Sequence, residues 1–400
     1  MNRLVIKKQA NTILTYDCQD DMLVTVQAET IGTSILGNIY VGKIQNIVSN
    51  IKAAFVEIQQ NVICYLSLSD CTEPIVCNRT YQGKLIIGDE VLVQVIRDKA
   101  KTKEATVSTK LSLSGHYSVV SYPNRKIGFS NKLSAIQRTS LKERITSLSW
   151  NHAYGYIIRT NAAEFADATV DITPLQSEIE QLTFQLDQII KTAPTRPPFS
   201  TLYCAPEKYL NLLKNTYRNR LDKIITDDET IYTQVESYLQ ENQPEDVDKL
   251  SFYQDSMISL EKMLRLDKKL QDALHTHVWL KSGGYLVIEP TEALTVIDVN
   301  TGKYSAKQDS EATFLAINLE AAAEIAHQIR LRNLSGIILV DFINMEQSKQ
   351  DELLLTTLRN HVKQDPIKTN VIDITALGLV EITRKKIEPP LCEQLSGILE

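Results

Sequence analysis

The chain has 400 residues, of which 43% are hydrophobic and 23% charged, and its formal net charge is -6. This length suits about two to four domains, and the acidic balance argues against a protein that coats nucleic acid indiscriminately. The net charge does not exclude binding to nucleic acid, because local basic patches decide it. No apolar run is long enough to span a membrane, and the start lacks a signal-peptide core. The six cysteines are scattered without a CxxC pair, which predicts neither a disulfide framework nor a zinc site and favours a reducing cytoplasm.

The first third of the chain is typical of short strands. Residues 3–7 and 22–27 are the clearest strands before residue 36. Five further runs rich in β-branched and aromatic residues follow within about 75 residues, which fits a small closed barrel such as an OB fold. These runs are 39–47, 53–58, 62–68, 90–97 and 106–113.

The middle of the chain mixes helix and strand. We expect a strand at 154–159, an amphipathic helix at 173–191, and a linker in the proline-rich stretch 192–200. Residues 205–275 are mostly helical by pattern, with a short strand at 223–225. From 283 to 384 strands and helices alternate, which predicts an open α/β layer. Its strands are expected at 285–288, 294–298, 337–341 and 371–374.

Two aspartates carry most of the functional information. Asp298 ends one apolar run and Asp341 ends the next, and a helical pattern fills about 309–333 between them. Strand, helix and strand predict a βαβ unit with parallel strands, which brings both carboxylates to the C-terminal edge of the sheet. Two adjacent carboxylates can hold Mg2+, so metal-assisted cleavage of a phosphate ester is the first functional hypothesis. The alternative is that each Asp only caps a helix or stabilises a loop.

The residues after Asp298 extend this hypothesis. Asn300 lies two positions on and would point to the same side of a strand, where it could bond a phosphate or a metal-bound water. Gly302 would let the backbone approach a ligand, and Lys303 would pair with phosphate. The same Asn-Thr-Gly sequence is also an ordinary turn.

Several blocks in this region resemble the catalytic domain of the ribonuclease E/G family. They are Val296-Ile-Asp-Val-Asn-Thr-Gly302, Asn318-Leu-Glu-Ala-Ala322, Ile329-Arg-Leu-Arg332, Gly336-Ile-Ile-Leu-Val-Asp-Phe-Ile343 and Leu377-Gly-Leu-Val-Glu-Ile-Thr-Arg384. The resemblance implies a multidomain α/β protein with an RNase H-like fold, an inserted barrel and a DNase I-like catalytic domain. The implied segments are RNase H-like parts at 1–35 and 201–273, an S1-type OB domain at 36–112, a 5′-sensor region at 113–200 and the catalytic domain at 274–400.

The resemblance also implies site residues. Asp298 and Asp341 would hold a catalytic Mg2+, with Mn2+ as the other candidate, and Asn300 would help orient the site. The expected reaction is hydrolysis of RNA to a 5′-phosphate and a 3′-hydroxyl by a metal-activated water. Arg159 and Thr160 match the pair that grips the RNA 5′-monophosphate, which suits the donor fork of arginine. Gly115 and Val119 match the backbone contacts to the same end. Without the family resemblance, an Arg-Thr dipeptide is common and indicates no function.

In the expected barrel, Phe55 and Tyr65 match exposed aromatic residues on which single-stranded bases stack. Lys103 matches a basic residue of the same surface, inside a local positive run with Lys99 and Lys101. Without the family, Phe55 is better read as a core residue. The lysine run is equally typical of a solvated hairpin tip.

The sequence departs from the family pattern at a cysteine motif, at residue 344 and, mildly, at Tyr65, where Phe is commoner. Family members carry a Cys-Pro-x-Cys motif after the catalytic domain, through which two subunits share a zinc ion, whereas this stretch contains only Cys392. One thiolate per subunit leaves a tetrahedral zinc half-ligated, so we expect no zinc, and any homodimer would lack this link. Asn344 stands where the family usually has a second Asp.

Three functions are compatible with these patterns. The leading hypothesis is a Mg2+-dependent endoribonuclease that cuts single-stranded, A/U-rich RNA, favours a 5′-monophosphate and acts in ribosomal RNA processing and messenger RNA turnover. The second is an RNA-binding or ribosome-assembly factor of the same family with weak or lost cleavage, which Asn344 and the missing zinc motif motivate. The third, a DNA-cleaving enzyme or phosphoesterase, is disfavoured by the expected barrel and sensor.

Overall fold

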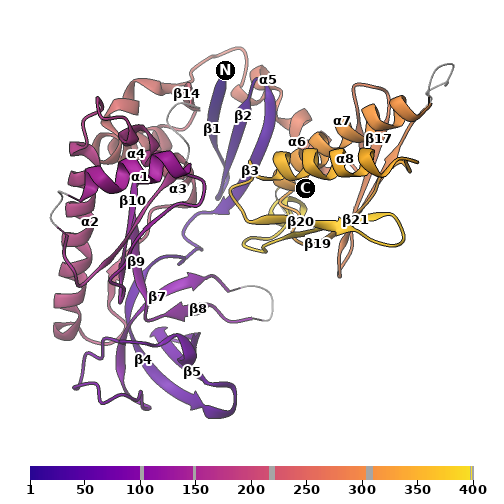
Figure 1. Ribbon diagram of the computed structural model, residues 1–400. Helices are drawn as coiled ribbons and strands as arrows, with labels where there is room; N and C mark the ends of the chain where they lie inside the picture. Colours follow the sequence, from indigo (N-terminus) through magenta and orange to yellow (C-terminus); the bar gives the residue numbers. More distant parts are fainter. Residues whose placement is uncertain (100–102, 147–149, 216–220, 303–309, 397, 399–400) are drawn as a thin grey trace. The chain divides into compact units, whose positions relative to one another are not determined.

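The computed structural model describes residues 1–400 except 100–102, 147–149, 216–220, 303–309, 397 and 399–400. The chain forms two compact units, each built from discontinuous segments (Figure 1). Unit 1 comprises Met1–Glu29, Leu221–Gln234 and Asp248–Glu400, and unit 2 comprises Thr30–Arg220 and Val235–Val247. None of the helices in the described ranges combines the length and apolarity that a membrane crossing requires.

Unit 1 begins with a five-stranded sheet in the order β15-β14-β1-β2-β3. The strand β1 pairs parallel with β14 and antiparallel with β2. Its three consecutive buried residues Leu4, Val5 and Ile6 show that both faces of this strand are covered. The bounds are β1 Asn2–Gln9, β2 Thr12–Gln19, β3 Met22–Thr30, β14 Lys223–Thr226 and β15 Leu250–Phe252.

This sheet joins the N-terminal strands to a segment more than 190 residues later. One domain split between residues 1–35 and 201–273 is therefore compatible with the strand pairing, while its RNase H-like character and the five segment boundaries stay predictions. Apolar residues of β1–β3 share a core with α5, α6 and α9, which span Leu260–Leu264, Leu266–Leu274 and Leu391–Gln394. The helix α4 (Glu229–Asn242) and the turn η6 (Pro244–Lys249) lie between β14 and β15 in sequence.

The second sheet of unit 1 has six strands in the order β16-β17-β18-β19-β21-β20. The helices α7 (Ser310–Leu331) and α8 (Ser348–Val362) pack on one face of it, where the core of this region lies (Figure 1). Apolar side chains of the opposite face, such as Val296 and Ile337, are exposed. The strands are β16 His277–Trp279, β17 Tyr285–Pro290, β18 Thr295–Asn300, β19 Gly336–Asp341, β20 Thr369–Ile374 and β21 Leu379–Arg384.

The predicted βαβ unit is confirmed, because β18 and β19 are parallel neighbours connected through α7. The rest of the sheet is antiparallel: β17 pairs with β16 and β18, and β21 pairs with β19 and β20. The sequence did not predict β21, which lies between β19 and β20 and pairs antiparallel with both.

Unit 2 contains the expected closed barrel of five strands. They follow the order β4-β5-β6-β8-β7, and a β4–β7 pairing closes the ring. Inward side chains such as Val56, Leu66 and Val93 form its core. The bounds are β4 Ile39–Val48, β5 Ala53–Gln59, β6 Val62–Ser67, β7 Glu90–Arg97 and β8 Thr106–Ser108, with short turns η1 at Ser49–Ile51 and η2 at Leu68–Asp70.

The single strand expected at 106–113 is wrong. Ser108 Oγ accepts the backbone N–H of Lys110 at 3.0 Å, and this local turn ends β8. The chain then starts β9 (Leu111–Ser114), which belongs to another sheet, β11-β12-β10-β9. That sheet also contains β10 Ser118–Tyr122, β11 Ile127–Phe129 and β12 Gly155–Ile158.

The helix expected at 173–191 is found as α2 (Thr173–Thr192), which packs on this four-stranded sheet. The proline-rich stretch is more than a linker, because Phe199 N–H donates to Val41 O at 2.7 Å and leads into β13, which extends β4. The remaining elements are α1 Ala135–Ile145, η3 Thr160–Ala166, η4 Ala193–Thr195, β13 Thr201–Tyr203 and α3 Lys208–Asn215.

Candidate active site

Asp298 and Asp341 lie directly opposite each other on the parallel strands β18 and β19. Neighbouring strands are about 4.8 Å apart, and side chains of register partners project to the same face. The alternate residues of both strands are buried under α7 and α8, so the two carboxylates belong to the open face. Asp341 is exposed and Asp298 is half-buried. The buried alternates are Ile297, Val299, Ile338 and Val340.

Asn300 completes the expected group. It is the last residue of β18, and its Nδ2 donates to Asp298 Oδ2 at 2.6 Å. The bond fixes the orientation of the Asp298 carboxylate and leaves its other oxygen without this constraint. The prediction that Asn300 points to the same side as Asp298 is confirmed, and residue 300 belongs to the strand rather than to a turn.

Gly302 makes a close backbone contact that the sequence analysis did not predict. Its φ of +66° is left-handed, and a Cβ there would lie 2.2 Å from the carbonyl oxygen of Gly283. The glycine therefore allows close packing against the β16–β17 turn, and its approach to a ligand stays a prediction. Lys303 lies outside the described residues.

Two polar residues of α7 hold the loops around the carboxylates, and the sequence analysis gave neither a role. Asn318 is fully buried, and its amide both donates to Ile343 O at 2.8 Å and accepts from Ile343 N–H at 3.1 Å. Glu320 accepts the N–H groups of Lys281 and Ser282. A buried Asn on an otherwise apolar helix face was the available signal, because such a residue must find partners.

The donors of this face fit a hard divalent cation. Mg2+ in enzymes is commonly held by one or two carboxylates, with water and substrate phosphate filling the other positions. Asp298 and Asp341 provide that minimum. Among the described residues, no group of three or more His, Cys, Asp or Glu side chains is arranged around a common point. Asn344 is exposed, three residues beyond Asp341, and its Oδ1 lies 3.5 Å from the Cβ position of Gly378.

The predicted RNA-contacting aromatics adjoin each other on the barrel of unit 2. Phe55 and Tyr65 are register partners on β5 and β6, with ring centroids 6.4 Å apart in an edge-to-face arrangement. Both are half-buried, whereas their strand neighbours fill the barrel core. The reading of Phe55 as a core residue is therefore wrong. Lys103 is exposed just before β8, which pairs with β6, and Lys101 lies outside the described residues.

The predicted 5′-sensor residues are partly brought together. A guanidinium N–H of Arg159 donates to the carbonyl oxygen of Gly115. Val119 is on β10 opposite Ile157 of β12, and Thr160 Oγ1 lies 2.9 Å from Ser130 Oγ. Burial lowers the pKa of Arg159, although the side chain keeps its charge at neutral pH.

Glu178 of α2 occupies the loop beside Gly115, and the sequence analysis did not find it. Its carboxylate accepts the backbone N–H groups of His116, Tyr117 and Ser118 and the Ser118 hydroxyl, at 2.6 to 3.2 Å. A run of backbone N–H groups of this kind is an anion-binding nest. Burial raises the pKa of Glu178, against the opposing effect of these hydrogen bonds. The carboxyl group of Glu178 thus already occupies the N–H groups of the Gly115 loop.

Buried basic groups surround the same loop. Lys214 Nζ donates to Ser114 O at 2.6 Å, and burial lowers the pKa of this amine to about 8. His116 Nδ1 lies 3.0 Å from Lys214 O and also contacts Gln243, and burial lowers the pKa of this imidazole to about 4. The region is therefore a tightly packed charged network.

Comparison with known proteins places these features in one family. The model of the Ribonuclease E/G family matches residues 112–387. The chain belongs to the ribonuclease E/G family. It is 31% identical to Ribonuclease G of Haemophilus influenzae over 90% of this chain and 75% of that protein, and 30% identical to Ribonuclease G of Escherichia coli K12 with the same coverage. Its 30% identity to Ribonuclease E of Haemophilus influenzae spans 89% of this chain but 38% of that longer protein.

The match to the ribonuclease E/G family covers the carboxylate pair on β18 and β19 and the region of Arg159. The barrel with Phe55, Tyr65 and Lys103 precedes the matched residues. The roles of all these residues stay predictions, and those of the barrel rest on its surface aromatics and on the longer similarity to the ribonucleases G.

Proposed function

We propose that this chain is a metal-dependent endoribonuclease that hydrolyses single-stranded RNA to 5′-phosphate and 3′-hydroxyl ends. The observation that carries the proposal is the register pairing of Asp298 with Asp341 on an open sheet face, in a member of the ribonuclease E/G family. Solvent and a substrate can reach this face, because its side chains are not covered by α7 and α8.

Asp298 and Asp341 would hold Mg2+, with Mn2+ as the other candidate. When bound, the cation supplies polarisation of the scissile phosphate and a water of lowered pKa. Asn300 keeps the Asp298 carboxylate in one orientation through its 2.6 Å hydrogen bond. Asn318 positions the chain beyond Asp341 by clamping Ile343, so both strand ends are held before the substrate arrives.

The remaining features support a single-stranded RNA substrate. Phe55 and Tyr65 offer half-exposed rings for stacking, and Lys103 offers a nearby positive charge for the backbone. Arg159, with Gly115, Val119 and Thr160, would favour RNA with a 5′-monophosphate. As the family resemblance implies, A/U-rich segments, ribosomal RNA processing, messenger RNA turnover and a cytoplasmic location belong to this proposal.

A second candidate is an RNA-binding or ribosome-assembly factor of the same family with weak or lost cleavage. Asn344 favours it, because an amide three residues beyond Asp341 offers a cation less charge than the Asp usual in the family. A homodimer without a shared zinc is compatible with either function. The zinc is not expected because Cys392 is the one cysteine of its stretch.

The deciding experiment incubates the purified protein with a fluorescent A/U-rich RNA bearing a 5′-monophosphate, in Mg2+ and in EDTA, beside Asp298→Asn. Cutting that requires Mg2+ and disappears in the variant supports the nuclease. RNA binding without cutting would favour the second candidate. Equal cutting by the variant would remove Asp298 from the site.

A further inference from the structure

The open face that bears the carboxylates continues into an aromatic pair at the β16 edge of the sheet. Trp279 of β16 is the register partner of Tyr285 of β17, which is in turn the register partner of Asn300. Register partners project to one face, so both rings lie on the side of Asn300 and Asp298. Direct contacts agree, because the Trp279 and Tyr285 ring centroids are 5.2 Å apart.

Trp279 is unusually accessible for its type. It is 71% exposed, although an indole offers a large apolar area that proteins normally bury. Across two strand spacings, its backbone lies about 10 Å from that of Asn300. A flat, exposed π-surface at this distance from the carboxylates is within reach of a nucleotide close to the scissile phosphate.

We propose that Trp279, supported by Tyr285, stacks on a base of the RNA substrate next to the scissile phosphate and so sets the position of cleavage. This inference rests on the proposed function, because it takes the carboxylate pair as the reaction centre. Unpaired bases stack readily on aromatic side chains without a strong preference for sequence. The platform would fix the register of the strand, while specificity would come from other contacts.

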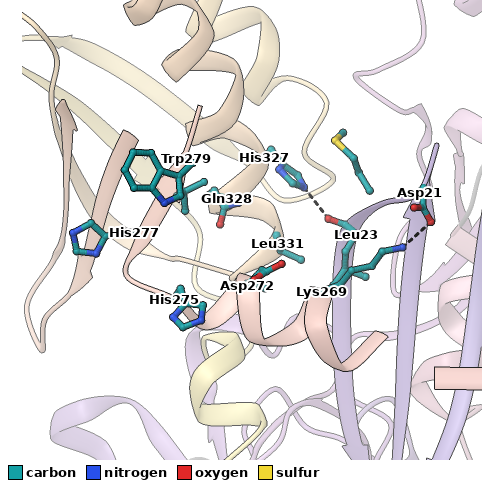
Figure 2. A pocket seen from close by; sticks show the side chains of 13 residues that line it. Asp21, Leu23, Lys269, Asp272, His275, His277, Trp279, His327, Gln328 and Leu331 are labelled. Carbon is teal, nitrogen blue, oxygen red and sulfur yellow. Dashed lines mark hydrogen bonds and ion pairs between the residues drawn. The ribbon is translucent and has the colours of Figure 1, made fainter. Parts of the chain in front are cut away.

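The hollow next to β16 is a less suitable place for the base. It measures about 650 Å³ and lies between β16, α6, α7 and the start of β3 (Figure 2). Two of its polar side chains are already paired, His327 Nε2 with Leu23 O at 2.8 Å and Lys269 Nζ with Asp21 Oδ1 at 2.7 Å. Figure 2 shows Trp279 at the rim, away from these pairs.

The first test measures binding without cleavage. The protein has two tryptophans, and the other, Trp150, is half-buried against Tyr156. A single-stranded A/U-rich RNA added in EDTA should quench the exposed Trp279, and Trp279→Phe should remove that signal while largely keeping affinity. Trp279→Ala should weaken binding by roughly 5- to 100-fold. Phe184→Ala is the matched control, because Phe184 is 66% exposed on α2 in the other unit.

The second test identifies the stacked base. RNAs with one abasic site at successive positions around the cut are compared in wild type and Trp279→Ala. At one position, the abasic site should weaken binding to wild type and have no effect on binding to the variant. Equal affinity of wild type and Trp279→Ala for the intact RNA would overturn the platform, as would a change in molecular mass of the variant by light scattering, which would assign the face to a second copy. Failure of wild type to cut in Mg2+ would refute the nuclease instead, and the EDTA binding data would still decide the platform.

Discussion

Asp298 and Asp341 occupy the same level of two neighbouring parallel strands, although 42 residues separate them in sequence. Two carboxylates this close repel each other unless a cation or a proton lies between them. The pairing therefore predicts that Asp341, whose side chain is exposed, contributes to cation binding rather than to the core.

Asp341→Asn should lower the cleavage rate by on the order of 1,000-fold, because a ligand to the metal contributes several kcal/mol of transition-state stabilisation. The residual activity should need a higher Mg2+ concentration, and RNA affinity in EDTA should be unchanged. Rates measured across a Mg2+ titration check this. Glu289→Gln removes an exposed charge from the same sheet face and serves as the matched control. Wild-type Mg2+ dependence in Asp341→Asn would contradict the assignment.

Asn344→Asp is expected to act in the opposite direction. Asn344 is exposed in the loop that Asn318 holds, so a carboxylate there costs little stability and adds negative charge three residues beyond Asp341. The Mg2+ concentration for half-maximal cleavage should fall by roughly 10-fold. A Mg2+ titration of the variant against wild type measures the shift, and Asn344→Ala controls for loss of the amide. No shift in Asn344→Asp would show that residue 344 is too far from the cation to matter.

The parts of this site that the sequence could predict are those set by local pattern. Two apolar runs that end in Asp298 and Asp341, with a helical pattern at about 309–333 between them, predicted the βαβ unit. The sheet order could not be predicted, because β21 enters between β19 and β20 by long-range pairing. Glu178 is equally invisible in sequence, since it meets the Gly115 loop from 60 residues away. The contact of Gly302 with Gly283 could not be predicted either, because a turn glycine looks the same in sequence whatever it packs against.

Arg159→Ala should abolish discrimination between 5′-monophosphate and 5′-hydroxyl RNA. The guanidinium would supply the charge-assisted contact to the phosphate. Since it also bonds to Gly115 O, the variant will lose some stability, so the quantity to measure is the ratio of cleavage rates for the two RNAs. That ratio should fall to about 1, while Arg159→Lys should retain part of it. A ratio that stays at the wild-type value, or a wild-type ratio of 1, would remove the sensor assignment.

His116 should make the stability of unit 2 depend on pH. Burial holds the pKa of His116 at about 4, whereas an unfolded imidazole titrates near 6.5. Between these pH values His116 is protonated in the unfolded chain but neutral in the folded chain. The free energy of unfolding therefore falls as pH falls from about 6.5 to 4. The accumulated loss is about 3 kcal/mol.

His116→Gln cannot titrate and should flatten this dependence, even if it is less stable at every pH. Urea unfolding from pH 4 to 7 measures the effect through Trp150 fluorescence, in a Trp279→Phe background so that the signal comes from unit 2. Glu178 has a raised pKa and contributes the opposite slope, and Asp246, Glu245 and Arg159 also act on the imidazole. Because these groups are common to both proteins, the difference between the two pH profiles isolates His116. Parallel profiles would mean that the imidazole has the same pKa in the folded and the unfolded protein.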